Sequence, residues 1–211
     1  MNQTLGKYIT ITLSGDLRAD VEAVFNHAQD PDTLDHVMKV AEHAVRISER
    51  FGVDRWKAER AALLHDISNI IPVREMLEAA EASGIQVTEE EYRYPRIVHQ
   101  KLSMAMAEQL FGISDPEILN AIECHTTLKK NPTQLDKVLF IADKISWELP
   151  GDHPYLDQIR DQVKGGWLDE AVLTYLDHVW EQRDQLRLVH SWLIAAREEL
   201  KLQVEYHSNK L

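Results

Sequence analysis

Ala61-Ala62-Leu63-Leu64-His65-Asp66 is the stretch of this sequence that decides the fold. Four apolar residues lead directly into an imidazole and a carboxylate, in a segment that Asp54 can cap as a helix. An ionised carboxylate is costly to bury unless a cation pairs with it or coordinates it. Side chains of adjacent helical residues point about 100° apart, so His65 can bind one cation while Asp66 lies between two. The stretch therefore predicts a helix that carries a buried metal site.

The same combination of an apolar run and a polar residue recurs three times farther along the chain. His99 follows Ile97-Val98, His125 follows Ala121-Ile122 and Cys124, and Asp143 follows the run Val138–Ala142. Each histidine alone is typical of a hydrogen-bonded core residue, and Asp143 alone could pair with Lys144 or Arg60. Together with the doublet they leave several buried polar groups to satisfy, which a shared metal does in one step. Imidazole and carboxylate donors without thiolate indicate iron, manganese, zinc or nickel.

The rest of the chain reads as helices with clear start and stop signals. Capping residues, prolines and glycines delimit predicted helices at 14–28, 33–51, 54–71, 72–83, 96–111, 115–125 and 133–147, with two or three more over 155–206. Thr88 with Glu91 makes a capping box for a short helical turn, and Pro150-Gly151 is a predicted break. Residues 8–13 alternate apolar and threonine side chains, which indicates a short strand or an extended arm. We therefore expect an all-α helical bundle with a short N-terminal extended arm and extra C-terminal helices.

Composition and charge are those of an ordinary globular protein. The 211 residues fit one domain with a terminal extension; 44% of them are hydrophobic and 27% are charged. The net charge of −12 disfavours binding to long nucleic acid but leaves small phosphorylated substrates open, because bound metal supplies local positive charge. No apolar run approaches about 18 residues and the N-terminus lacks signal-peptide features, so we expect a cytoplasmic protein without membrane contact. The single cysteine, Cys124, excludes an intramolecular disulfide and fits a reducing compartment.

The order of these polar residues resembles that of the HD-domain phosphohydrolases. His36, the His65-Asp66 doublet and Asp143 match the motif that gives this family its name, and His99 and His125 resemble the variant that holds two metals. From about Leu34 to Leu176 the chain is most similar to the bacterial branch of symmetrical diadenosine tetraphosphate hydrolases. The matching segments are Ala62–Asp66, His99–Leu102, Ala121-Ile122 with His125-Thr126, Leu135–Lys137 and Ile141–Ile145.

This resemblance implies a site for two divalent metal ions. The implied ligands of one ion are His36, His65, Asp66 and Asp143. The resemblance implies that Asp66 also binds a second ion, whose other ligands are His99 and His125. Iron is the first expectation, with manganese, nickel, zinc and magnesium as alternatives. The implied substrate is a small phosphorylated nucleotide, for example diadenosine tetraphosphate cleaved to two ADP. The implied organisation is an N-terminal arm and helix (1–32), the phosphohydrolase domain (33–176) and a C-terminal helical extension packed on it (177–211), with a homodimer left open.

The residues around the expected ligands depart from the family pattern. The family usually has an arginine, a lysine, a small residue and a Glu-Pro pair with an arginine at four places near the ligands. This chain has Thr33, Asn69, Thr127 and Ser146-Trp147-Glu148 there. The candidates for catalysis are Asp66 and Lys101, and those for substrate binding are Lys101, Lys129, Lys144 and Trp147. Each lysine could instead be a solvated surface residue, and Trp147, one helical turn after Asp143, could be a core residue.

Two other functions stay open on this sequence. One is a phosphomonoesterase or pyrophosphohydrolase that acts on another nucleotide, since a fold does not fix a substrate. The other is a non-catalytic module that binds metal or nucleotide, which the altered residues at positions 33, 69 and 146 motivate.

Overall fold

The computed structural model describes residues 3–147 and 153–208, and every regular element among them is helical. The α-helices are α1 (Gln3–Gly6), α2 (Leu17–Ala28), α3 (Pro31–Arg50), α4 (Arg55–Leu64), α5 (Val73–Ala82), α6 (Glu89–Arg93), α7 (His99–Gln109), α8 (Pro116–Cys124), α9 (Gln134–Ser146), α10 (Pro154–Gly165), α11 (Leu168–Glu181) and α12 (Ser191–Ser208). Short 3-10 helices lie between them at η1 (Ile67–Ile70), η2 (Pro95–Val98) and η3 (Arg183–Gln185). The predicted all-α fold is confirmed. Within the described ranges, no helix combines the length and the apolar character needed to cross a bilayer.

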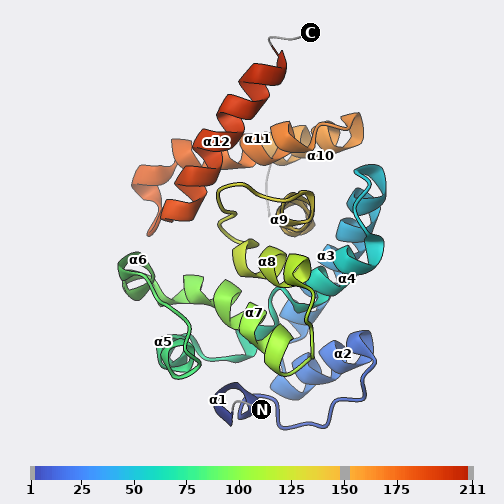
Figure 1. The fold of residues 1–211 in the computed structure, drawn as a ribbon, viewed down its shortest axis with the longest axis vertical. Helices are drawn as coiled ribbons and strands as arrows, with labels where there is room; N and C mark the ends of the chain where they lie inside the picture. The colour runs from blue at the N-terminus through green and yellow to red at the C-terminus, as the bar shows by residue number, and fades with distance from the viewer. Residues whose placement is uncertain (1–2, 148–152, 209–211) are drawn as a thin grey trace.

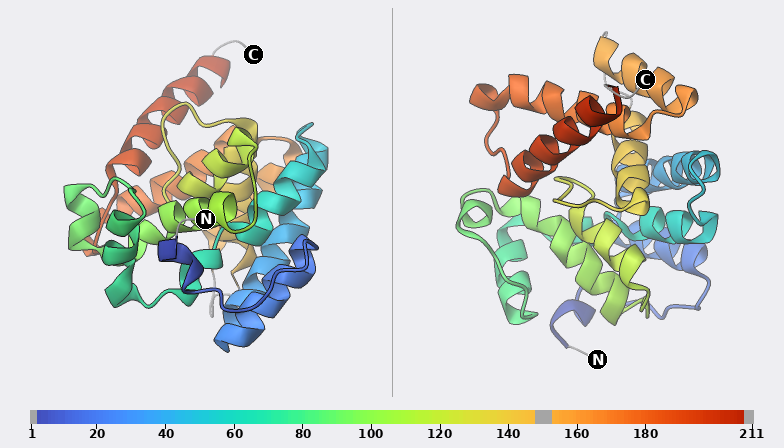
Figure 2. Two further views of the ribbon diagram at one scale, coloured as in Figure 1. Left: turned by 60° about the horizontal axis from the view of Figure 1, so that its bottom comes forward. Right: turned by 45° about the horizontal axis from the view of Figure 1, so that its top comes forward.

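The helices are arranged around α9. On one side α9 packs against α3, α4 and α8, and α7 packs against α8. In Figure 1, α10 and α11 lie above α9, and α12 crosses α11 at the top of the molecule. Figure 1 has α1 at the bottom of the molecule and α12 at the top, and the right-hand view of Figure 2 shows the same order. α9 is thus the central helix of the bundle.

α9 is buried on all sides. Every residue from Leu135 to Ser146 is buried, as expected for a helix with apolar residues around its whole circumference. Asp143 and Lys144 continue this run, so a carboxylate and an ammonium group lie at the centre of the bundle. Charged groups in such a place need partners from neighbouring elements.

Several predicted helix ends are confirmed, and two are wrong. Asp54 caps α4, and Thr88 forms a capping box with Glu91. The helix predicted from Ser14 begins instead at Leu17, because Asp16 is the capping residue and the Ser14 hydroxyl donates to Asp20. The helix that carries the doublet ends at Leu64, so His65 and Asp66 lie in the turn between α4 and η1 rather than on a helix.

The N-terminal segment packs as an arm. None of residues 8–13 is in a strand, so the alternative of a short strand is wrong. The apolar side chains of this segment are partly buried against the core; they are Tyr8, Ile9, Ile11 and Leu13. The predicted break at Pro150-Gly151 lies outside the described residues.

A buried ionic cluster joins the start of α12 to α6 and α7. Glu91 is fully buried and accepts a hydrogen bond of 2.9 Å from the Lys101 ammonium group. His190 accepts from the backbone N–H of Trp192 through Nδ1, so its Nε2–H points to Glu91 at 3.4 Å. Burial alone would raise the pKa of Glu91, but His190, Lys101 and the backbone of Thr88 lower it from 4.5 to about 2. Glu91 therefore ties the C-terminal helix to the body of the protein.

We predict that Glu91→Gln lowers the free energy of unfolding at neutral pH by about 3 kcal/mol, because it leaves the buried Lys101 charge uncompensated. In the wild type the folded-state pKa of Glu91 is below the unfolded value, so the ionised group stabilises the fold above about pH 4.5. That contribution is lost as the pH falls toward about 2, and the variant should lack this part of the acid transition. Denaturant unfolding followed by circular dichroism at several pH values measures both effects.

The matched control is Glu89→Gln, on the same helix. Glu89 pairs with Arg93 at the surface, and exposed pairs contribute about 0 to 1 kcal/mol. Equal losses in the two variants would contradict the role given to Glu91.

Candidate metal centre

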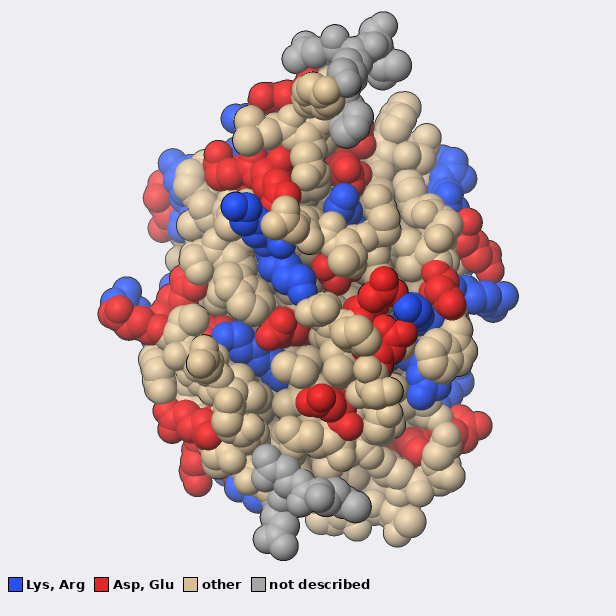
Figure 3. Space-filling model, viewed as in Figure 1, with Lys and Arg blue, Asp and Glu red and all other residues tan. Residues whose placement is uncertain are grey.

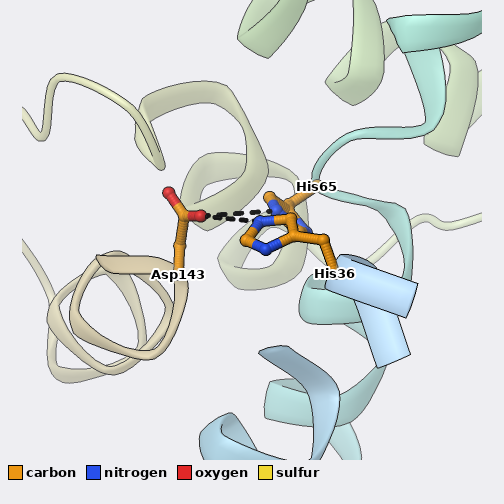
Figure 4. A group of neighbouring side chains, drawn as sticks. All are labelled: His36, His65 and Asp143. Carbon is orange, nitrogen blue, oxygen red and sulfur yellow. Dashed lines mark hydrogen bonds and ion pairs between the residues drawn. The ribbon is translucent and has the colours of Figure 1, made fainter. Parts of the chain in front are cut away.

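Six residues from five parts of the chain converge at the centre of the bundle, and each residue as a whole is at most 8% exposed. α3 supplies His36, the turn after α4 supplies His65 and Asp66, the start of α7 supplies His99, the residue after α8 is His125, and α9 supplies Asp143. In Figure 4 the rings of His36 and His65 both face the Asp143 carboxylate. All six residues expected as metal ligands are thus brought together.

Three of the histidines lie at the ends of helices and use Nδ1 in the same way. His65 follows α4, His99 follows η2 and His125 follows α8. Nδ1 of each lies within hydrogen-bond distance of the carbonyl oxygen three residues earlier, at 2.6 Å for Ala62, 2.8 Å for Arg96 and 2.8 Å for Ile122. A carbonyl oxygen only accepts, so each ring donates its Nδ1–H there. Nε2 of each ring is then left with a lone pair that points into the cluster.

The electrostatics agree with neutral imidazoles and ionised carboxylates. Burial lowers the pKa of His65, and it lowers the pKa of His125 to about 4. The pKa of Asp66 lies well below its usual range although burial alone would raise it, so this carboxylate is ionised. At neutral pH the site therefore offers unprotonated nitrogen atoms and negative oxygen atoms, which is the form in which these side chains bind metal.

Two buried atoms of the cluster have no hydrogen-bond partner among the described residues. They are Nε2 of His65 and Oδ1 of Asp66. In addition, Nε2 of His99 and Nε2 of His125 face each other at 3.1 Å, although both carry lone pairs. Two ligand atoms about 2.1 Å from one ion lie about 3.0 Å apart at a right angle and about 3.4 Å apart at the tetrahedral angle. A cation between these atoms accounts for arrangements that would otherwise be unfavourable.

The donors fall into two overlapping groups. Three ligand atoms of His36, His65 and Asp143 lie within 4.8 Å of one another, and so do three of His65, Asp66 and His125. The two carboxylate oxygens of Asp66 face different neighbours. Oδ2 is 3.6 Å from Nε2 of His65, whereas Oδ1 is 3.3 Å from Nε2 of His99 and 3.5 Å from that of His125. Asp66 therefore stands between the two halves of the cluster, so the residues present fit two ions that share it.

Lys144 holds the second oxygen of Asp143. Its Nζ lies 2.6 Å from Oδ2, while Oδ1 of the same carboxylate is 3.0 Å from Nε2 of His36. Burial opposes both charges, but each favours the other: Lys144 holds the pKa of Asp143 well below its usual range, and Asp143 raises the pKa of Lys144. One oxygen of Asp143 is thereby left for the cluster. Lys144 is thus buried beside the expected ligands and is not a solvated surface residue.

Trp147 covers one end of the cluster. Its indole stacks on the ring of His36, with 4.2 Å between ring centroids and 28° between planes. The side chain is 49% exposed, so the alternative of a core tryptophan is wrong.

Two of the candidate lysines point elsewhere. The Lys101 ammonium group is bound by Glu91 and by the carbonyl of Gln86, so this geometry does not support the predicted contact with substrate phosphate. Lys129 donates to the carbonyl and the side-chain oxygen of Asn120, at 3.3 and 3.2 Å. Its role in substrate binding stays a prediction.

Thr126 was not among the functional residues predicted from the sequence. The Thr126 hydroxyl lies 3.1 Å from Nε2 of His99, at the opposite half of the cluster from Trp147. Its position directly after His125, in a segment that matched the family motif, was the available signal.

The chain is similar to several known proteins. A model of the HD domain matches residues 33–148. A Lactococcus lactis subsp. cremoris protein named "Uncharacterized protein in pepC 5'region" is 40% identical over 152 residues, which cover 72% of this chain and 76% of that protein. The symmetrical bis(5'-nucleosyl)-tetraphosphatase of Staphylococcus aureus is 33% identical over 139 residues, or 65% of this chain and 70% of that protein. The crystal structure of a predicted HD superfamily hydrolase involved in NAD metabolism from Clostridium acetobutylicum has a TM-score of 0.80 and 27% identity, and the match covers 92% of this chain and 100% of that chain.

We predict that the wild-type protein binds about two divalent ions per chain and that Asp66→Ala binds almost none, because Asp66 faces both halves of the cluster. His36→Ala and His99→Ala should each retain about one ion, since each removes a ligand from one half only. Elemental analysis of protein loaded with iron or manganese under reducing conditions measures the stoichiometry. His27→Ala, which removes a surface histidine bound to Thr10, is the control and should bind as the wild type does. Full metal content in Asp66→Ala would rule out the shared carboxylate.

Proposed function

Because the chain belongs to the HD domain family, we propose that it is a metal-dependent phosphohydrolase that acts on a small nucleotide. The first reaction to test is the symmetrical cleavage of diadenosine tetraphosphate to two ADP. The relative from Staphylococcus aureus is named for this class of reaction. Residues 33–148, which match the HD domain model, contain all six candidate ligands.

One observation carries the proposal. Three helix-end histidines donate Nδ1–H to backbone carbonyls and leave their Nε2 lone pairs facing the carboxylate of Asp66 or that of Asp143. A purely structural core would pair such lone pairs with donors, but Nε2 of His65 has no hydrogen-bond partner within the described residues. A site with imidazole and carboxylate donors and no thiolate suits iron, and manganese, nickel and zinc are the alternatives. Divalent ions in such a site lower the pKa of a water molecule and neutralise charge on a phosphoryl group.

The residues of the chain have distinct parts in this proposal. The ions would be held by His36, His65, Asp66, His99, His125 and Asp143. Lys144 keeps Asp143 ionised and occupies the oxygen that the ion does not use. Trp147 offers an exposed indole next to His36, where a nucleobase can stack.

The net charge of −12 disfavours a long polyanionic substrate. On the face shown in Figure 3, acidic and basic side chains are interspersed apart from one short band of basic side chains. A long polyanion needs a continuous basic stripe, whereas a nucleotide needs only the local positive charge of the site.

The deciding experiment is a product analysis. We expect protein loaded with iron or manganese to convert diadenosine tetraphosphate to ADP as sole product, and the metal-free protein or Asp66→Ala to be inactive. A parallel panel of nucleoside monophosphates, diphosphates and triphosphates identifies a phosphomonoesterase or pyrophosphohydrolase instead. Tight nucleotide binding without turnover under every metal would overturn the proposal in favour of a binding module.

We predict that Trp147→Ala raises KM for the nucleotide about tenfold and changes kcat little, because one stacking contact with a base contributes about 1 to 3 kcal/mol. Trp147→Phe should restore most of the affinity. The measurement is steady-state kinetics at saturating metal.

Trp167→Ala is the matched control, since Trp167 is 58% exposed on the turn between α10 and α11. A control that raises KM as much as Trp147→Ala would show that the loss comes from general instability.

A further inference from the structure

Thr126 contacts the metal-binding nitrogen expected of His99 from the partly exposed side of the cluster. The Thr126 hydroxyl lies 3.1 Å from Nε2 of the His99 ring, and the side chain is partly exposed while the six cluster side chains are buried. Trp147 has the corresponding place at the other half of the cluster, where it stacks on His36. Partly exposed polar and aromatic groups thus contact both halves of the cluster.

The direction of this hydrogen bond follows from the other nitrogen of the ring. Nδ1 of His99 lies 2.8 Å from the carbonyl of Arg96 and must donate there, since a carbonyl only accepts. Nε2 therefore carries a lone pair, and the Thr126 hydroxyl donates its proton to it. The hydroxyl consequently uses the same lone pair that His99 would give to a metal ion.

Thr126 cannot keep this bond when His99 acts as a ligand. A hydroxyl group can redirect its proton by rotation about the C–O bond, without movement of the oxygen atom. The freed proton then needs another acceptor next to the ion. In a site that binds phosphate, the acceptor with the highest negative charge is a phosphoryl oxygen.

Hydrogen bonds fix the backbone that carries the Thr126 side chain. The N–H of Thr126 donates to Oε1 of Gln100 at 3.2 Å, and the N–H of Leu128 donates to the carbonyl of Cys124 at 2.7 Å. Leu128 is fully buried with φ of 57°, a left-handed conformation that is costly for a residue with a branched side chain. Such a conformation persists only where the surroundings enforce it, and it is enriched at functional sites.

We propose that Thr126 is a phosphate-contacting residue: its hydroxyl donates to Nε2 of His99 in the metal-free protein and to a phosphoryl oxygen when His99 binds metal. This inference rests on the proposed function in that the ligand is the phosphoryl group of the substrate. It assigns a specific donor to that group, at the half of the site formed by Asp66, His99 and His125.

The test is the variant Thr126→Val, which replaces the hydroxyl by a methyl group of similar size. Metal affinity is measured by calorimetry with manganese, and binding of inorganic phosphate is measured on the metal-loaded protein. We expect metal affinity equal to or higher than that of the wild type, because the hydroxyl no longer competes for the lone pair. We expect phosphate to bind about tenfold more weakly, which corresponds to the loss of one hydrogen bond to a charged group. Thr126→Ser, which keeps the hydroxyl, should restore phosphate affinity.

A merely structural role of Thr126 predicts the opposite change in metal affinity. If Thr126 only supported the ring of His99, Thr126→Val would lose metal affinity, and that outcome would overturn the proposal. Equal phosphate binding by the wild type and Thr126→Val, including no binding by either, would overturn it as well. Thr126→Ala provides the same comparison should the valine variant fail to fold.

The matched control is Thr174→Val, which removes another threonine hydroxyl with a single side-chain partner, Oε1 of Gln162, between α11 and α10. It should leave both affinities unchanged. Phosphate binding requires no turnover, so this experiment is separate from the product analysis. A wild type that hydrolyses no nucleotide would end the proposed function, while weaker phosphate binding by Thr126→Val would still establish the contact.

Discussion

The fixed direction of three imidazole rings is the constraint on which the rest of this structure depends. His65, His99 and His125 each donate Nδ1–H to a carbonyl at the end of the helix that precedes them. A carbonyl oxygen only accepts, so the bond sets the tautomer of the ring. The backbone therefore orients the ligand at each of these positions.

This arrangement makes the centre of the bundle depend on positive charge. Asp66 and Asp143 are buried carboxylates, and Lys144 compensates only one oxygen of Asp143. Oδ1 of Asp66 and Nε2 of His65 have no hydrogen-bond partner within the described part of the chain. Unsatisfied buried groups reduce the stability of a folded protein, and such departures from good packing are concentrated at functional sites. The protein thus retains a local cost at its centre that bound cations would remove.

The elements outside the cluster position it in different ways. α9 supplies Asp143 from the most buried helix, and the contacts of Ser68 with Ser103 and the carbonyl of His99 fix η1 against α7. The cluster of Glu91, Lys101 and His190 joins the C-terminal helix to the same α7, on which His99 is the first residue. Trp147 and Thr126, both partly exposed, contact the two halves of the cluster. Substrate recognition is proposed for this partly exposed pair, whereas the ligands are set by the buried helices.

The sequence by itself determined the helical fold, most helix boundaries and the six residues that meet at the centre. Most of these features depend on local signals, namely capping residues, apolar periodicity, and polar residues at the ends of apolar runs, whereas His36 was predicted only from the resemblance to the HD-domain family. The contact partners of individual side chains were decided only by the tertiary structure. Lys101 pairs with Glu91 rather than with the cluster, and Trp147 stacks on a histidine 111 positions earlier in the chain, because helices distant in sequence pack beside them. The end of α4 is also a feature that only the tertiary structure decided. There the His65 ring, whose Nε2 faces the cluster, donates Nδ1–H to the carbonyl of Ala62.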